Sequence, residues 1–545
     1  MAGIAIQLKR IFKRGTVVSM LEGVGYSTMT TIAPMLIVIL NLLAMYRVLD
    51  VATISFAQRE LLSCSILYVF IFSLLVTSPF NAVLSRYVAD SIYEERYEEV
   101  MPCFYTGLLL NILAAAMLAI PFYLWEIFRG GVDPVFVFTT FCMFMGMVLV
   151  FYGMLYLSTT KDYVAISAQF IAGMVLAFLL SLLFTWALGM PVIYAIQLSL
   201  AIGFFFTAVL EFAFLRGYFR ESSGNYGRVL SYFRTYWKLF VTNLAYTLGL
   251  FCHNFVFWGT GMQMRVAGTY VCAQPYDMAS CIAMFTNISA TVITIVLIET
   301  KFHDVYQRYS EYVIGGKLAD IQKEKSRMFR RLSQLFTRLA ELQFMISVIV
   351  FLVCVVFLPN LGLAGQVMTI YPSLAAAYFV TFFMYSGILL LYYFDDLTGA
   401  CLAAVVFLLV TLGGTLFSSR LTEAWYGIGL LLGAFTAWMV CYARLHWLEK
   451  NFDAHIFCRG KLLDVKENEM PDPVVYRRPA AAAAGGGKPA GVQRQQSSQS
   501  DTGRRATQEM RPRHAGGSFP GESRQSTGKR PAHAADEPKK ADKQL

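Results

Sequence analysis

The sequence predicts an all-α, polytopic membrane protein with about twelve transmembrane helices. The first observation behind this prediction is composition: 57% of the 545 residues are hydrophobic, only 15% are charged, and the mean hydropathy is +0.54. Soluble domains usually carry about 25% charged residues, so this chain has too little charge to cover several soluble domains. The second observation is that the apolar residues form runs of about 20, the length a helix needs to cross a bilayer.

Twelve such runs follow one another along the chain, and each is predicted to be one span. They begin after a basic amphipathic N-terminal segment, residues 1–22. The spans are 23–46, 61–85, 101–125, 134–158, 163–188, 192–215, 238–259, 278–298, 340–359, 369–393, 398–418 and 422–443.

The spacing of the runs divides the chain into two halves. Six spans form a predicted first lobe, 23–215, and six more form a second lobe, 238–460, with a cytoplasmic linker, 216–237, between them. Two sets of six spans are typical of an internal duplication. From 477 to 545 the composition changes to Ala, Gly, Gln, Ser, Pro and basic residues, which predicts a disordered tail.

This tail explains most of the net charge of +10. It holds 14 Lys and Arg against 6 Asp and Glu, a difference of +8. The excess of basic residues is therefore no sign of a nucleic-acid partner.

The distribution of Lys and Arg orients the spans, because cytoplasmic loops carry an excess of both. If the N-terminus lies in the cytoplasm, the inner segments hold most of the basic residues outside the tail. The outer loops then hold only Arg47, Arg59, Arg129, Arg265 and Arg420. Both termini are therefore expected in the cytoplasm.

A second cytoplasmic segment, 299–339, lies within the second lobe. Its apolar residues recur at helical spacing on either side of Gly315 and Gly316. One interpretation is two amphipathic helices that lie at the membrane surface or against a partner. The alternative is that they simply continue spans eight and nine into solvent, and the sequence leaves both open.

The sequence lacks the catalytic motifs of several common enzyme classes. It has no Walker A motif, since Lys488 in the tail is followed by Pro and not by Ser or Thr. It also has no HExxH or GxSxG motif, no Asp-x-Asp pair and no CxxC pair. We therefore expect neither catalysis, nor a metal, nor a cofactor, which leaves transport or scaffolding.

For a transporter, ionisable groups in or near the spans are the first candidates, because each is costly to hold in lipid. The candidates for the substrate pathway or a gate are Glu22, Arg86, Glu211, Glu299 and His253, which is followed by Asn254. For Arg86, Glu211 and Glu299 the alternative is a charge at the cytoplasmic interface that reaches water along its own stem. His253 could couple transport to protons or be a neutral, hydrogen-bonded residue.

Two further observations concern charges at the cytoplasmic side. When the halves are offset by 213 residues, Arg86 and Glu299 occupy equivalent places with opposite charges, so we hypothesise that they pair to close a central cavity. Lys161 and Asp162 precede span five and are candidates for contact with a substrate headgroup or partner. The alternative for these two is a solvated turn.

A series of short motifs resembles the PelG family of Pel exopolysaccharide transporters, in order from residue 1 to about 460. These motifs include Leu75-Val76-Thr77-Ser78-Pro79-Phe80, Ser85-Arg86-Tyr87-Val88-Ala89-Asp90, Lys161-Asp162-Tyr163, Pro275-Tyr276-Asp277-Met278, Glu299-Thr300-Lys301-Phe302 and Tyr392-Tyr393-Phe394-Asp395. The resemblance implies the MOP flippase superfamily, with two six-helix lobes and alternating access. It also implies export of a cationic, amino-sugar-rich polymer across the cytoplasmic (inner) membrane.

The resemblance further implies partners and a kind of cavity. The partners would be a cytoplasmic glycosyltransferase (PelF) and the membrane subunits PelD and PelE. A cationic polymer favours acidic walls, for which Glu22, Asp90, Glu211 and Glu299 are available. Two alternatives remain: a cation-coupled multidrug exporter of the same superfamily, and a non-transporting scaffold of a polysaccharide synthase complex.

Overall fold

Helices account for nearly all of the described residues. The computed structural model describes residues 33–160, 163–297, 302–361 and 363–457. The predicted segment 1–22, the tail 477–545, and the candidates Glu22, Lys161, Asp162 and Glu299 lie outside the described residues. All described residues belong to one unit, Met1–Asp464.

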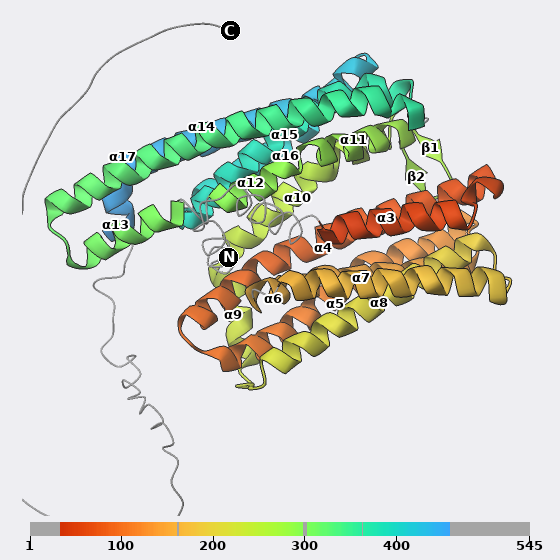
Figure 1. Cartoon of the computed structure of the whole chain (residues 1–545), viewed down its shortest axis with the longest axis horizontal. Helices are drawn as coiled ribbons and strands as arrows, with labels where there is room; N and C mark the ends of the chain where they lie inside the picture. The colour runs from red at the N-terminus through yellow and green to blue at the C-terminus, as the bar shows by residue number, and fades with distance from the viewer. Residues whose placement is uncertain (1–32, 161–162, 298–301, 362, 458–545) are drawn as a thin grey trace, which may run out of the picture. The chain divides into compact units, whose positions relative to one another are not determined.

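The helices form two groups, which are shown in Figure 1. The first group contains α3 (Ala33–Val48), α4 (Phe56–Tyr93), α5 (Val100–Trp125), α6 (Pro134–Thr160), α7 (Tyr163–Leu182) and α8 (Val192–Tyr218). The second contains α10 (Trp237–Phe257), α11 (Gln274–Asn287), α12 (Ser289–Leu297), α13 (His303–Gly315), α14 (Leu318–Phe357), α15 (Gln366–Tyr393), α16 (Leu397–Ser418) and α17 (Ile428–Phe457). The short helix α9 (Tyr226–Thr235) connects the groups. A two-stranded antiparallel hairpin, β1 (Met264–Arg265) and β2 (Val271–Cys272), connects α10 to α11.

The prediction of an all-α polytopic membrane protein is confirmed. Within the described residues, ten helices are long and apolar enough to cross a membrane, and they correspond to predicted spans two to seven and nine to twelve. The first predicted span appears as the shorter apolar helix Leu36–Val48, because the residues before Ala33 are not described. The eighth predicted span is divided between α11 and α12, since the helix is interrupted at Ile288.

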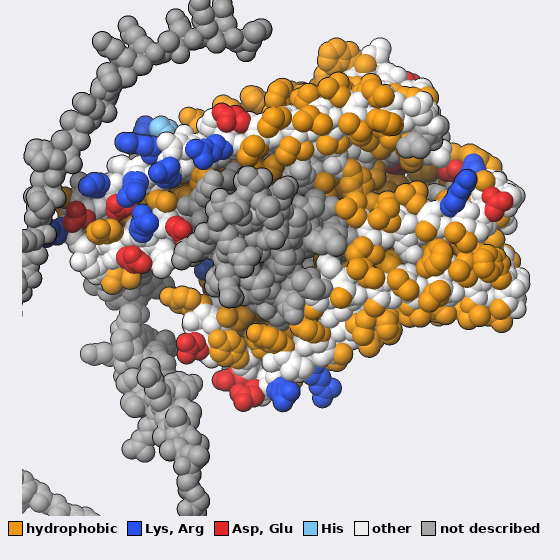
Figure 2. Space-filling view, in the orientation of Figure 1, with side chains coloured by type: hydrophobic (Ala, Val, Ile, Leu, Met, Phe, Trp, Pro, Cys, Tyr) orange, Lys and Arg blue, Asp and Glu red, His pale blue; other side chains and the backbone are white. Residues whose placement is uncertain are grey.

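The outward surfaces of the helices are apolar, as a lipid-facing surface requires. On α5 the exposed side chains recur every three or four residues and so form one stripe: Leu109, Leu113, Met117, Ile120 and Leu124. Figure 2 shows apolar side chains over both groups, with Lys and Arg gathered over the ends of α14 and α17.

Close packing within each group depends on small residues. A Cβ atom added to Gly203 of α8 would lie 2.9 Å from the carbonyl oxygen of Gly173 in α7. In the second group, a Cβ atom at Gly414 of α16 would lie 3.0 Å from the Cα atom of Gly429 in α17. Larger side chains at these positions would separate the helices, as is common where membrane helices cross.

Within its described residues, the segment 299–339, predicted to be cytoplasmic, does not contain two helices that are separate from the predicted spans. The part after Lys317 continues span nine without a break, so that α14 runs from Leu318 to Phe357. Only α13 is a separate helix, and it packs against α14. In the part of α14 before the predicted ninth span, apolar residues such as Met328 and Leu332 are buried, and the ring of Phe329 lies 5.2 Å from that of Phe452 in α17.

Candidate functional site at the contacts between the helix groups

The two groups meet along a seam between α4 and α10. Of the candidate residues, Arg86 and Asp90 lie on α4, and His253 and Asn254 lie on α10. The hydroxyl groups of Ser78 and Thr247 are 2.8 Å apart at the middle of the seam. The ring of Phe80 lies 5.3 Å from that of Phe240 towards the end that the sequence assigns to the cytoplasm. The ring of Phe72 stacks on that of Phe255 at 5.8 Å towards the predicted outer end.

Arg86 joins the two groups at the predicted cytoplasmic end. It lies near the end of α4, and its Nε donates to Oδ2 of Asp90, one turn later, at 3.1 Å. Its guanidinium lies 5.5 Å from the ring centre of Tyr236, and its Nη1 lies 3.6 Å from Oδ1 of Asp395 in the second group. We call the contact of Arg86 with Tyr236 and Asp395 the inner contact.

A rigid turn positions Asp395 after α15. The residue has a left-handed backbone with φ +55°, which Asp tolerates better than most residues. The next residue, Asp396, is fully buried, accepts from the backbone N–H of Gly399 at the start of α16, and pairs with Arg444 of α17 at 2.6 Å. The hypothesis that Arg86 pairs with Glu299 stays a prediction, because Glu299 lies outside the described residues; the acidic partner from the second group that the structure describes is Asp395.

Helix α9 closes one side of the inner contact. The buried carboxylate of Glu99 holds it, accepting from Arg228 of α9 at 2.8 Å and from Arg96 at 2.9 Å. Tyr232 of α9 donates to Asp90 at 3.4 Å. Burial, and next the negative charge of Asp90, raise the pKa of Tyr232, so its hydroxyl group stays protonated and able to donate.

His253 and Asn254 each make buried polar contacts in the second group. The Nδ1 atom of His253 is 2.9 Å from the hydroxyl group of Tyr276, and its Nε2 is 3.4 Å from that of Tyr378. Asn254 donates to Oδ1 of Asp277 at 2.7 Å. His253 is fully buried and has two hydrogen-bonding neighbours, as a neutral histidine would.

Asp277 was not among the predicted site residues, although it lies in one of the motifs that carry the family resemblance. Besides Asn254, its carboxylate accepts from Nε1 of Trp258 at 2.9 Å and from the backbone N–H of Ala273 at 3.0 Å. The sequence did contain a signal for it, since an acidic residue just after Pro275 is typical of the first turn of a helix. That signal indicates the start of a helix, but it does not indicate a buried carboxylate that accepts several hydrogen bonds.

Trp258 connects the hydrogen bonds of Asp277 to the first group at the predicted outer end. Its ring lies 4.8 Å from the ring of Tyr68 in α4. The hydroxyl group of Tyr68 donates to the carbonyl oxygen of Val271 at 2.6 Å, and the ring of Tyr270 lies 5.7 Å from that of Phe122 in α5. We call the contact of Tyr68 and Phe122 with Trp258, Tyr270 and Val271 the outer contact.

Backbone groups extend the outer contact. The N–H of Gly268 in the hairpin donates to the carbonyl oxygen of Gly130, just beyond α5, at 3.2 Å. A Cβ atom at Gly268 would lie only 2.7 Å from the carbonyl oxygen of Arg129. Glycine is therefore needed at this position for the hairpin to approach α5 so closely.

Glu211 lies away from both contacts. It is 1% exposed, inside the first group, and its carboxylate contacts Gly153 of α6. The alternative that it reaches water along its own stem is therefore wrong. Within the described residues, neither of its carboxylate oxygens has a hydrogen-bond partner.

The described residues contain no group of three or more His, Cys, Asp or Glu side chains that could hold a metal ion. The two contacts thus consist of an ion pair with an aromatic ring at one end and buried aromatic rings with hydrogen bonds at the other. Arrangements of this kind can separate and re-form.

Solved structures of membrane transporters share this fold. An outward-facing multidrug resistance MATE family transporter of the MOP superfamily has a TM-score of 0.54 at 14% identity, covering 79% of this chain and 96% of that chain. A variant of the Vibrio cholerae MATE transporter VcmN has a TM-score of 0.55 at 10% identity, covering 82% and 98%. A MOP superfamily transporter from Pyrococcus furiosus has a TM-score of 0.52 at 14% identity, covering 79% and 96%.

At these identities the likeness shows the fold alone. Among curated proteins, none matches the sequence of this chain. A family comparison supplies what the structures do not, because PelG, described as "Putative exopolysaccharide Exporter (EPS-E)", matches residues 1–457. The chain is a multi-pass membrane transporter with the fold of the MOP superfamily, and it belongs to the PelG family of exopolysaccharide exporters.

Proposed function

We propose that this protein exports a Pel-type exopolysaccharide across the cytoplasmic membrane by alternating access. The observation that carries this proposal is the match to the PelG family over residues 1–457, which includes every described helix. The cationic, amino-sugar-rich character of the polymer follows from the resemblance. Asp90 beside the seam is the acidic pathway candidate, with Glu22 and Glu299.

The proposed orientation has both termini in the cytoplasm of a bacterial cell and the chain in its inner membrane. The positions of basic residues support it. At one end of the helix groups lie Arg86, Arg96, Arg228 and the arginines of α13 and α14, whereas the opposite end holds few basic residues. An excess of Lys and Arg is typical of the cytoplasmic side.

The two contacts would alternate during transport. To open the pathway outward, Tyr68 must leave Val271 and Trp258, and to open it inward, Arg86 must leave Asp395. The network of Asn254, Asp277 and Trp258 supports this role for the outer contact, because the Asp277 carboxylate accepts from both Asn254 and the indole N–H of Trp258. A change in this network would therefore be transmitted to Tyr68.

The polymer would be supplied by a PelF-like cytoplasmic glycosyltransferase, with PelD-like and PelE-like membrane subunits. The cytoplasmic side of the second group is the proposed docking surface, where α13 and the start of α14 lie outside the predicted spans. Removal of this segment would be a poor test, since the buried face of α14 packs against α17. Substitutions of its exposed residues, scored by co-purification of the glycosyltransferase, are the better test.

A deletion strain tests the proposed function directly. We expect extracellular polymer to disappear while glycosyltransferase activity in isolated membranes persists. Persistent export would contradict a transport role and favour a scaffold. Normal polymer together with new drug sensitivity would favour a multidrug exporter.

Two native cysteines offer a test of alternating access. The side chain of Cys64 in α4 interacts with that of Cys272 in β2, across the outer contact, and both are buried and free. A thiol cross-link between them, verified by mass spectrometry, should stop export because the outer end can no longer open. The Cys64→Ser variant should export normally under the same treatment. Normal export by the cross-linked protein would show that the outer contact need not separate.

A further inference from the structure

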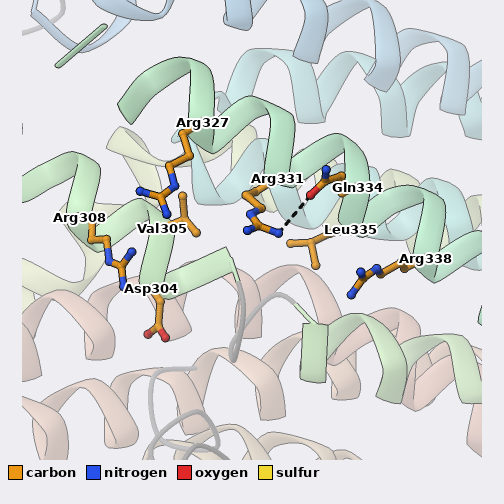
Figure 3. Close-up of a pocket in the computed structure, with 8 residues that line it drawn as sticks. All are labelled: Asp304, Val305, Arg308, Arg327, Arg331, Gln334, Leu335 and Arg338. Carbon is orange, nitrogen blue, oxygen red and sulfur yellow. Dashed lines mark hydrogen bonds between the residues drawn. The ribbon is translucent and has the colours of Figure 1, made fainter. Parts of the chain in front are cut away.

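A cavity rich in arginine lies between α13 and α14, apart from both contacts. Its volume is about 270 Å³, and Figure 3 shows the side chains that surround it. The residues that line it are Asp304, Val305, Arg308, Arg327, Arg331, Gln334, Leu335 and Arg338.

Helical periodicity places these arginines on one face. Arg327, Arg331, Gln334 and Arg338 are spaced by four, three and four residues, so they follow one another along the same side of α14. Arg308 approaches from α13, one turn after Asp304 in the lining. The apolar residues of this part of α14, which include Met328 and Leu332, are buried on another face.

The positive charge in the cavity is only partly balanced, because four arginines line it and only one carboxylate, that of Asp304, lies among them. Arg327 pairs with Glu324 at 3.3 Å, and Arg331 donates to the neutral amide oxygen of Gln334 at 3.2 Å. Within the part of the chain that the structure describes, Arg308 and Arg338 form no ion pair. Bringing like charges together is unfavourable unless an anion balances them, so the cavity has the electrostatics of an anion site.

The chemistry of the lining favours a phosphate group. Guanidinium groups bind phosphate oxygens in a bidentate way, with more and better-directed hydrogen bonds than an ammonium group makes. The cavity is of the size of a headgroup or a small phosphate ester, near the lower end of the range for small-ligand sites. A concave site of this size does not suit a folded protein surface.

The cavity extends from the predicted membrane boundary into the cytoplasm. Arg338 lies two residues before the predicted ninth span, which starts at residue 340. Arg327 lies 11 residues earlier, which is about 16 Å along the helix axis. A phosphate could therefore reach the cavity from the headgroup layer of the membrane or from the cytoplasm.

We propose that the cavity between α13 and α14 binds a phosphate-bearing ligand through Arg308, Arg331 and Arg338, with either an anionic lipid or a soluble phosphate ester as the source. This site is independent of the proposed export function. To test the proposal, the full-length protein is placed in phosphatidylcholine nanodiscs, and the binding of inorganic pyrophosphate is measured by titration calorimetry. In the second arm, nanodiscs of phosphatidylcholine and phosphatidylglycerol are used, and the phosphatidylglycerol that stays bound is measured by native mass spectrometry.

The variant for both arms is Arg308→Gln with Arg331→Gln, and the matched control is Arg330→Gln. Arg330 is exposed on the same helix but does not line the cavity. We expect the double variant to weaken binding by about tenfold or more for each guanidinium removed, because charge-assisted hydrogen bonds are lost, and the control to bind normally.

If the double variant loses pyrophosphate binding, the ligand is a soluble phosphate ester. If it loses bound phosphatidylglycerol, the ligand is a lipid headgroup. If the double variant unfolds, the single Arg331→Gln variant is measured instead. Binding of neither probe by the natural protein, or equal loss in Arg330→Gln, would overturn the proposal.

Discussion

The outer and inner contacts join the same two helix groups by different physical means. At the outer contact, the rings of Tyr68, Trp258 and Tyr270 are at most 8% exposed, and Tyr68 donates a short hydrogen bond to a backbone carbonyl. At the inner contact, the Arg86 and Asp395 side chains are 37% and 56% exposed and 3.6 Å apart. Buried aromatic contacts contribute more than exposed ion pairs, which are typically worth about 0.2–1 kcal/mol.

This difference indicates which end opens more easily. Water and salt reach the inner contact and weaken it, whereas separation of the outer contact exposes apolar rings and breaks hydrogen bonds. The proposed alternating access therefore requires a source of free energy that offsets the cost of separating the outer contact. The following changes test whether the outer contact is indeed the stronger one.

The largest effect is expected from Trp258→Ala. This change removes the ring packed on Tyr68 and leaves the Asp277 carboxylate without one of its donors. Truncation of a buried Trp costs about 3–5 kcal/mol in protein cores. We expect a clear fall in the melting temperature of the detergent-purified protein and loss of export. Trp425→Ala, at an exposed tryptophan of the same end, is the control. An equal fall in both variants would refute the special role of Trp258.

Asp277→Asn should have the next largest effect. The amide keeps one acceptor but presents an N–H₂ group to donors such as Trp258 or Ala273, so one buried donor is left unpaired. The expected cost is about 1–3 kcal/mol of stability. Thermal unfolding measures it, with the exposed Asp50→Asn as the control, since Asn tolerates the left-handed backbone at that position. An unchanged melting temperature would show that the hydrogen bonds of the carboxylate do not stabilise the protein.

Tyr68→Phe is a smaller change, because it keeps the ring and removes only the hydroxyl group. Loss of the bond to Val271 should cost about 0.5–1.5 kcal/mol. We expect faster labelling of Cys64 and Cys272 by a thiol reagent, as the outer end separates more often. Tyr371→Phe removes a hydrogen bond to Thr286 inside the second group and should leave the labelling rate unchanged. Equal labelling in all three proteins would contradict the role of Tyr68 in closure.

The smallest effect on stability is expected from Arg86→Gln, at about 0.2–1 kcal/mol and less at high salt. Arg234→Gln, at an exposed residue of α9, is the control.

The pairing of Arg86 with Asp395 is tested by charge exchange. Arg86→Glu combined with Asp395→Arg should restore export that each single variant loses, whereas rescue by Glu299→Arg instead would favour the pair proposed from the sequence offset.

The sequence predicts most of the fold because lipid imposes one strong requirement, a long apolar run for every span. It fails where that requirement is relaxed. The eighth span contains Asn287, which donates to the backbone carbonyls of Ala283 and Ala375. Next to Asn287 the helix is interrupted, so that the span consists of α11 and α12. Hydropathy does not report such a local change.

The candidate site was harder to predict, because its contacts join residues far apart in sequence. The offset of 213 led to the hypothesis that Arg86 pairs with Glu299, which lies outside the described residues and so stays a prediction. The offset did not indicate Asp395, the acidic residue 309 positions away that the structure places beside Arg86. Tyr68 and Val271 meet only because the hairpin folds over α4. Tertiary pairs of this kind leave no local pattern in one sequence.

The continuity of α14 has a mechanical consequence. Its 40 residues make a rod of about 60 Å, of which roughly half lies before the predicted ninth span. In a helix of this length, a rotation of about 10° at the predicted span moves the N-terminal tip by about 5 Å. A ligand or protein bound near that tip would therefore move together with the second helix group.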